Sequence, residues 1–364
     1  MTACMHAMYP IPMLPGPVSV PDAILAAMRH DYPSGDLEAD FFELYQHTRQ
    51  GLAELMGTRN DVVIMTGEGM LALWAALKSC LKPGDRVLAA VTGVFGDGLG
   101  DMAVSLGCEV RKFRLGYNET LGDLGLLETM LEDFSPDMIL AVHCETPSGT
   151  LNPLESLGGI ARRHGSLFCV DAVSSIGGVE IRADAWGVDL LLGGSQKCLS
   201  VPPSMSFLSV SHRAWERIER TGYQGYDALA PWRSINGEYA CPYTPYWHGL
   251  AALHAGVRLI LHEGPERVFA RHAEVARQCR DGLRELGIAL WPAPGSVPSP
   301  TVTAAMVPAD ATWNEWRARL RARGLAVGGN LGPLAGKVFR LGHMGSQARQ
   351  KLMAEALAVL RAAI

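Results

Sequence analysis

Short β-rich runs alternate with longer amphipathic stretches from about residue 60 to residue 210, and this alternation constrains the fold more than any other feature. Strands separated by helices can join one sheet in parallel, because each helix returns the chain to the same edge. Helical spacing of apolar residues occurs over 71–81 and 154–164. We therefore expect an α/β fold with a mostly parallel, seven-stranded sheet. The predicted strands are 61–65, 86–90, 109–113, 138–143, 167–170, 190–192 and 205–210.

The pattern changes beyond this region. Two prolines at 202–203 predict a short turn and an antiparallel final strand. After Thr244 the spacing becomes helical over 248–261 and 264–286. The remainder has short strands near 289–291, 301–307 and 337–341, and helices at 313–323 and 346–363. We divide the chain into an N-terminal segment at 1–20, a large α/β domain at 21–260, a connecting helix at 261–287 and a small α+β domain at 288–364.

Composition excludes several function classes. The formal charge is -5 and the basic residues are scattered, which argues against a nucleic-acid partner. No apolar stretch reaches the roughly 18 residues needed to span a bilayer, so we expect no membrane partner and a cytoplasmic location. The eight cysteines form no C-x-x-C pair, which favours reduced thiols over disulfides or a metal site.

Two charged residues follow apolar strands. Asp171 ends the strand in V-D-A-V-S-S, and Lys197 follows another strand in G-G-S-Q-K. Ligands bind at the carboxyl edge of open α/β sheets. A carboxylate there needs a positive partner, which a protonated pyridine nitrogen supplies, and a lysine amine can form a Schiff base and carry protons. Either residue alone could be an ordinary surface charge, but the pair indicates vitamin B6 chemistry.

Several segments resemble the class V aminotransferases, a family that includes alanine–glyoxylate and serine–pyruvate transaminases. They are P-G-P-V at 15–18, H-C-E-T-P-S-G-T-L-N-P at 143–153, the run at 171–210, and F-R-L-G at 339–342. The resemblance implies a fold-type I, pyridoxal-phosphate-dependent transferase. It also implies a small-molecule amine and keto acid as partners, cofactor binding by the large domain, and a homodimer or homotetramer with shared active sites that the N-terminal segment joins.

The resemblance assigns roles to individual positions. Phe95, expected in a loop after a strand, matches the aromatic residue that stacks on the cofactor ring, although it could also pack in the core. Val173 matches the residue on the other face of the ring, and Thr146 matches the hydroxyl near its 3-oxygen. Arg340 matches the arginine that grips the substrate carboxylate, a task that suits a planar fork, although a surface ion pair is an alternative.

Other positions belong to the edge of the expected site. Gly16 is assigned to the substrate side, and Tyr32 either lines the substrate entrance or packs in the protein. Tyr243, assigned to substrate binding, and Thr244, assigned to cofactor binding, are expected to reach the site of a neighbouring subunit. Gln196, next to the lysine, is expected to contact either a phosphate or a hydroxymethyl group of the cofactor.

The turn T-G-E-G-M departs from the family pattern. Here Glu68, followed by Gly69 and Met70 at the start of a helix, takes the place of a hydroxyl residue that binds phosphate. Two like charges about 4 Å apart repel by of order 4 kcal/mol at an effective dielectric near 20. Cys241 also replaces a tyrosine that contacts phosphate from the partner subunit. Alternatively, Glu68 only complements the helix macrodipole.

An acidic residue at this turn is typical of pyridoxamine–pyruvate transaminases, which the chain also resembles in Y-N-E at 117–119 and R-L-G-H-M-G at 340–345. We expect the chain to move an amino group from pyridoxamine to pyruvate, giving pyridoxal and L-alanine. The catalytic residues would be Lys197, through its Schiff base, and Asp171, with Glu68 accepting a hydrogen bond from the 5′-hydroxyl.

One position argues for a different transaminase. Leu331, in G-G-N-L-G-P, stands where the pyridoxamine–pyruvate enzymes have a second arginine, and this segment resembles alanine–glyoxylate transaminases. The alternative is therefore a pyridoxal-phosphate-dependent alanine or serine aminotransferase that uses glyoxylate or pyruvate. A more remote alternative is a non-catalytic protein that binds vitamin B6.

Overall fold

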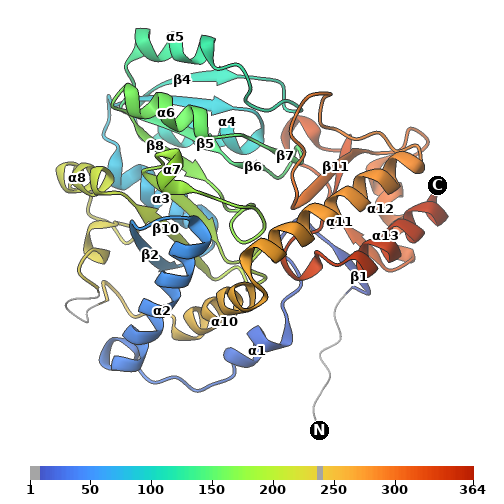
Figure 1. The fold of residues 1–364 in the computed structure, drawn as a ribbon, viewed down its shortest axis with the longest axis horizontal. Coiled ribbons are helices and arrows are strands. Elements are labelled where there is room, and N and C mark those ends of the chain that lie inside the picture. The colour runs from blue at the N-terminus through green and yellow to red at the C-terminus, as the bar shows by residue number, and fades with distance from the viewer. Residues whose placement is uncertain (1–8, 236–240) are drawn as a thin grey trace.

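A seven-stranded sheet forms the centre of the larger part of the protein in this computed structural model, which describes residues 9–235 and 241–364 (Figure 1). The strand order is β2-β10-β9-β8-β5-β3-β4. The α/β class and the seven strands predicted for the sheet are confirmed, each within two residues of the expected limits. The strands are β2 (Asp61–Thr66), β3 (Arg86–Val91), β4 (Glu109–Arg114), β5 (Met138–Val142), β8 (Leu167–Asp171), β9 (Leu190–Gly194) and β10 (Met205–Val210).

β10 runs antiparallel to both of its neighbours, β2 and β9, as the two prolines predicted. The connection from β9 to β10 is consequently a short loop of residues 195–204. The loop is braced by Ser195, whose hydroxyl donates to the Pro202 carbonyl at 2.6 Å and accepts from the Met205 amide at 3.2 Å. This braced loop carries Lys197.

Helices cover both faces of the sheet. The predicted helices over 71–81 and 154–164 correspond to α3 and α6, while sequence periodicity did not reveal several others. The helices of this region are α1 (Asp22–Ala27), α2 (Ala39–Met56), α3 (Gly69–Cys80), α4 (Val94–Ser105), α5 (Gly125–Phe134), α6 (Glu155–Arg163), α7 (Ala183–Trp186), α8 (His212–Thr221) and α10 (Trp247–Glu263).

α4 corrects one expectation: Phe95 lies in the first turn of this helix and not in a loop. Three glycines within the helix lower its intrinsic helix propensity and hide it from sequence analysis. Packing requires at least two of them. A Cβ on Gly100 would lie 2.5 Å from the Lys112 side chain, and one on Gly96 would lie 3.1 Å from the Ala90 carbonyl.

The C-terminal region has a core of its own, reached through the long helix α11 (Pro265–Glu285) (Figure 1). β11 (Val302–Met306) pairs antiparallel with β13 (Val338–Gly342), and helices α12 (Trp313–Ala322) and α13 (Gln350–Ala363) pack beside them. The strand expected at 289–291 is only an isolated bridge between Leu290 and Ala305. We call residues 288–364 the small domain.

The N-terminal segment joins the small domain. β1 (Ile11–Met13) pairs in parallel with β12 (Leu325–Val327), an interaction that the three-residue run I-P-M could not reveal. The described cysteines are all free, and most are buried. Within residues 9–235 and 241–364, no helix is long and apolar enough to cross a membrane.

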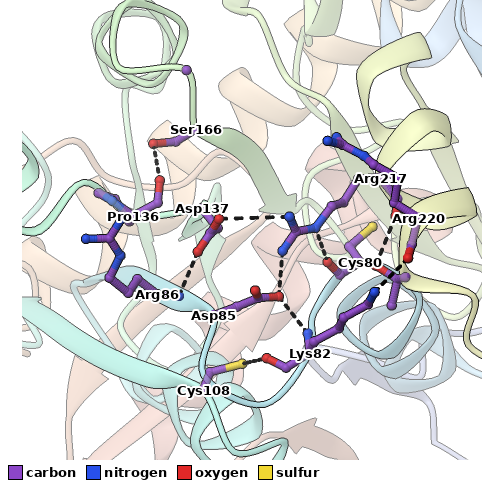
Figure 2. Close-up of polar contacts among 12 residues, drawn as sticks. Cys80, Lys82, Asp85, Arg86, Cys108, Pro136, Asp137, Ser166, Arg217 and Arg220 are labelled. Atoms are coloured by element: carbon purple, nitrogen blue, oxygen red, sulfur yellow. Dashed lines mark hydrogen bonds and ion pairs between the residues drawn. The ribbon is translucent and has the colours of Figure 1, made fainter.

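A polar network holds the amino ends of the strands, opposite the edge where Asp171 ends β8 (Figure 2). Arg217 of α8 donates to Asp85 at 2.5 Å and to the Cys80 carbonyl at 2.8 Å, and its guanidinium lies 3.9 Å from Asp137. Asp137 in turn accepts from the Arg86 amide at 2.9 Å. The network joins the loops that precede β3 and β5 and leaves the carboxyl edge for ligands.

Candidate active site

Lys197 lies at the carboxyl edge of the sheet, on the braced loop after β9. Its Nζ donates to the Pro15 carbonyl at 2.7 Å. Burial, followed by the nearby positive charge of Arg340, lowers the pKa of Lys197 to about 8. A useful fraction of the amine is therefore neutral near physiological pH, which is the form that attacks a carbonyl or accepts a proton.

Asp171 is the last residue of β8, and its side chain is buried. Its Oδ1 accepts from the Val173 amide at 2.9 Å, and no salt bridge to it is present in the described part of the chain. Burial raises the pKa of Asp171 to about 6; Lys197 opposes this shift and Glu68 adds to it. A buried carboxylate with one hydrogen bond fits a cationic ring nitrogen as its missing partner.

The two residues expected on the faces of a ring are both half-buried. Val173 packs against Gly69 at the start of α3, where an added Cβ would lie 2.9 Å from Cγ2 of Val173. Phe95 is fixed through its backbone, because Glu145 accepts from its amide at 3.2 Å and from the Gly96 amide at 2.6 Å. Burial raises the pKa of Glu145 to about 7.

Thr146 is buried next to this glutamate. Its hydroxyl lies 2.5 Å from the Ser174 hydroxyl, so one of its hydrogen bonds is already made inside the protein. A hydroxyl can donate one hydrogen bond and accept others, which leaves Thr146 capable of a further bond to a ligand oxygen.

Glu68 caps the N-terminus of α3. Its Oε1 accepts from the Met70 amide at 3.1 Å, and its Oε2 accepts from Gln196 Nε2 at 3.2 Å. Gln196 is buried, and its Oε1 has no partner among the described residues. The carboxylate thus occupies the helix terminus at which phosphate binds in many proteins, while Gly69 and Met70 lie in the first turn.

Arg340 lies on β13 of the small domain. Its Nε donates to the Gly329 carbonyl at 2.8 Å, and burial lowers the pKa of its guanidinium to about 10. The charge of Arg340 is felt at Lys197. Gly16 packs on the same lysine: a Cβ there would lie 2.5 Å from Lys197 Cδ and 2.7 Å from Nζ. The arginine, the lysine and the glycine therefore share one site.

Leu331 is 48% exposed in a loop of the small domain. The preceding residue, Asn330, donates through Nδ2 to the Pro147 carbonyl at 2.8 Å, one residue after Thr146. The loop that carries Leu331 is thus tied to the segment that carries Thr146.

Of the remaining predicted residues, Tyr32 and Tyr243 pack within their own chain. The Tyr32 hydroxyl donates to the Ala27 carbonyl at 3.0 Å, and its ring stacks on Trp247 at a centroid distance of 4.9 Å. Tyr243 stacks on Tyr226 at 4.2 Å, and Thr244 is exposed. In the described residues, none of these three has a hydrogen bond or ring contact with the residues around Lys197.

Three contributors were missed by sequence reasoning. The Pro15 carbonyl is a backbone group and has no side-chain signature. Glu145 lies inside the quoted motif at 143–153, but its role in capping α4 depends on the fold. Gln347 binds the N-terminal segment from the far end of the chain, and no local pattern marks it. Only covariation with residues near position 15 could have pointed to it.

Comparison with known proteins places this site in a family. Residues 16–332 match the family Aminotransferase class-V. The pyridoxamine–pyruvate transaminase of Mesorhizobium japonicum is 31% identical over 364 residues, covering 99% of this chain and 92% of its own length. The crystal structure of pyridoxamine–pyruvate aminotransferase from Mesorhizobium loti has a TM-score of 0.93 at 31% identity and covers 99% of this chain and 93% of its own.

A second solved structure carries a different name. Alanine–glyoxylate aminotransferase from Nostoc sp. has a TM-score of 0.91 at 32% identity, covering 98% of this chain and 96% of its own. The family model and the named relatives agree with the motifs that carried the resemblance. The chain therefore belongs to the class V aminotransferases, and it is a fold-type I transaminase from a family that depends on pyridoxal phosphate.

Proposed function

We propose that the chain moves the amino group of free pyridoxamine to pyruvate, giving pyridoxal and L-alanine. In the net reaction, the C4′ carbon of pyridoxamine loses the amino group and one hydrogen and gains an oxygen from water, while the α-carbon of pyruvate loses its keto oxygen as water and gains the amino group and one hydrogen. The observation that carries the proposal is the Glu68 carboxylate at the N-terminus of α3, held by the Met70 amide and by Gln196.

The position of Glu68 disfavours a phosphate. Its carboxylate already accepts a hydrogen bond from an amide at the helix terminus, so a phosphate dianion would compete for that terminus and be repelled. A neutral 5′-hydroxymethyl group could instead donate a hydrogen bond to Glu68. Gln196 Oε1, buried without a partner in the described residues, offers a second acceptor nearby.

The other residues divide the chemistry between them. When bound, the pyridine ring would act as the electron sink, and the buried carboxylate of Asp171 would keep its nitrogen protonated. Lys197 Nζ would carry a proton between C4′ and the amino-acid α-carbon, a task that its lowered pKa suits. The Arg340 guanidinium would bind the carboxylate of the keto acid.

A second candidate rests on Leu331. With an exposed leucine in the loop that Asn330 ties to the Thr146 segment, carboxylate recognition falls to Arg340 alone. The second candidate function is therefore that of a pyridoxal-phosphate-dependent alanine or serine aminotransferase that acts on glyoxylate or pyruvate. In that case Glu68 would have to turn away from the N-terminus of α3.

We also propose that two copies share their active sites. Thr244 is exposed on the segment before α10, and Tyr243 is next to it, so this segment is available to a neighbouring copy. Tyr32 packs on Trp247 at the start of the same helix. Sedimentation analysis at several concentrations tests the dimer, with Thr244→Ala as a variant of the proposed shared site.

The deciding experiment compares phosphorylated and free forms of the vitamin. The purified protein should lack visible absorbance and should turn over free pyridoxamine with pyruvate. Pyridoxamine phosphate should be a much poorer amino donor. A yellow protein from which phosphate-bearing cofactor is recovered, and which transaminates glyoxylate with alanine, would favour the second candidate and overturn the first.

A further inference from the structure

Residues 14–19, which we call the N-terminal strap, lie between the Lys197 loop and the small domain. The strap meets the lysine loop at two points: the Pro15 carbonyl accepts from Lys197 Nζ at 2.7 Å, and the Val18 amide donates to the Gln196 carbonyl at 3.2 Å. Its opposite side faces the region that follows Arg340 on β13. The strap thus contacts both the candidate base and the small domain, beside a second contact in which the Ser346 amide donates to the Ser200 hydroxyl at 2.8 Å.

Gln347 holds the strap on both sides of Pro15. Its Nε2 donates to the Leu14 carbonyl at 2.8 Å, and its Oε1 accepts from the Ser19 amide at 3.1 Å. The same Nε2 donates to the Gly342 carbonyl, at the end of β13, at 2.6 Å. Because Gln347 is only 1% exposed, all of these bonds form away from water and are fixed in direction.

The strap has little room to move while these bonds exist. A Cβ on Gly342 would lie 2.2 Å from the Leu14 carbonyl oxygen, and a Cβ on Gly328 would lie 2.6 Å from Pro15 Cδ. On the lysine side, Gly16 has a φ of 98°, and a Cβ there would meet Lys197. Glycines at all three contacts let the backbone of the strap approach this closely.

We infer that Gln347 is a positioning residue, which fixes the Pro15 carbonyl against Lys197 Nζ by clamping both ends of the N-terminal strap to the small domain. The inference rests on the proposed role of Lys197 in catalysis. Gln347 itself touches no reacting atom. Its effect reaches the lysine through the strap, so movement of the small domain is transmitted to the candidate base.

The hold of Gln347 on the strap, which we call the clamp, also controls how much water reaches the amine of Lys197. Burial is the largest cause of the lowered pKa of Lys197, and the strap covers its amine. A loosened strap admits water to Nζ, and the pKa of Lys197 then rises toward its ordinary value. The other charged groups that act on this amine are Arg340 and Asp171, together with the thiols of Cys144 and Cys198.

The test uses Gln347→Met, which keeps the length of the side chain and removes all three hydrogen bonds. Thr303→Val is the matched control. Thr303 is buried in the same domain and pairs with His343 Nε2 at 2.8 Å, and it has no hydrogen bond to the strap. Both variants lose buried hydrogen bonds of the small domain, but only the first releases the strap. Thermal unfolding of each variant reports the general loss of stability.

The first readout is hydrogen–deuterium exchange in the protein without added vitamin, followed in a peptide that covers residues 14–19. We expect exchange in this peptide to become roughly tenfold faster or more in Gln347→Met and to stay unchanged in Thr303→Val. The second readout is the pH dependence of pyridoxal attachment. Its midpoint should rise by about one unit in Gln347→Met only.

The third readout is steady-state kinetics. We expect kcat to fall roughly tenfold or more in Gln347→Met, with KM for the keto acid within about threefold, because Arg340 is untouched. If Gln347→Met does not fold, Ser346→Ala replaces it. The Ser346 hydroxyl donates to the Ser19 carbonyl at 2.5 Å, and its loss should shift the readouts in the same direction by less.

The outcomes separate this inference from the proposed function. Equal strap exchange and an equal pH midpoint in Gln347→Met and Thr303→Val would overturn the positioning role. Failure of the wild-type protein to use pyridoxamine would overturn the proposed substrate. In that event, strap exchange and the pH dependence of pyridoxal attachment still test the clamp.

Discussion

Replacing Glu68 by serine should convert the vitamin preference of this site. Serine is a good N-cap, so α3 keeps a partner for its first-turn amides, and stability should change by about 1 kcal/mol or less. A negative charge disappears from the N-terminus of α3, the kind of position at which phosphate binds in many proteins. Removing a like charge about 4 Å away is worth of order 4 kcal/mol at an effective dielectric near 20, and less where salt and water screen it.

The expected change is therefore a factor between about 30 and 1000 in the relative affinity for phosphorylated and free vitamin. Titration of the protein with pyridoxal and with pyridoxal phosphate, followed by visible absorbance, gives the two Kd values. Their ratio should move toward pyridoxal phosphate in Glu68→Ser. Glu68→Gln is the control, because it removes the charge and keeps the size, and it should give part of the same shift.

The reasoning would be refuted by a ratio that stays within about threefold of the wild type in both variants. That result would mean that the Glu68 carboxylate does not face the 5′ substituent. Glu68 would then only cap α3, and the alternative that the carboxylate serves the helix terminus would hold.

Three further predictions concern buried charges. Asp171→Asn should lower activity by at least about a hundredfold. Without bound vitamin, the Asp171→Asn variant should nevertheless unfold at a higher temperature than the wild type at pH 7. Burial raises the pKa of Asp171 to about 6, so the wild-type protein loses stability as pH rises through that value, and the variant does not. The rate of pyridoxal attachment should rise with pH and level off above about 8, the lowered pKa of Lys197. Arg340→Met should move this midpoint upward by removing a positive charge, while Arg340→Lys should leave it nearly in place. Burial lowers the pKa of His143 and His272 to about 4, so each histidine destabilises the fold as pH drops from 6.5 toward that value, because the unfolded chain takes up the protons. Glu145 and Asp171, whose pKa values are raised, act in the opposite direction over the same range, so urea unfolding of the wild type is compared with that of His272→Gln. The stability difference between wild type and variant should shrink from pH 7 to pH 5, and a constant difference would contradict the prediction.

The sheet could be predicted from sequence because its strands are buried, continuous apolar runs bounded by turn residues. Helices were harder to predict where tertiary packing outweighs propensity. α4 contains three glycines, two of which are needed for close approach to β3 and β4, and this hid the helix that carries Phe95. β1 is three residues long and contains a proline, so only its pairing with β12 identifies it.

The candidate site shows the same division. Asp171 and Lys197 follow recognisable strands, and Arg340 lies within a short apolar strand. The motifs and the strand pattern, taken together, therefore identified these three residues from the sequence. The supporting contacts depend on the fold, since Gln347 and Pro15 are more than 300 positions apart along the chain. The packing of Tyr32 on Trp247 likewise could be recognised only in the folded structure, because both residues lie in segments with no catalytic pattern.

Borohydride reduction followed by peptide mass spectrometry tests the central claim most directly. The protein is incubated with pyridoxal or with pyridoxal phosphate at equal concentration, reduced and digested. We predict that pyridoxal labels the peptide containing Lys197, and that pyridoxal phosphate labels it far less. Absence of label at Lys197 with either aldehyde would contradict its assignment as the reactive amine, and stronger labelling by pyridoxal phosphate would contradict the role of Glu68.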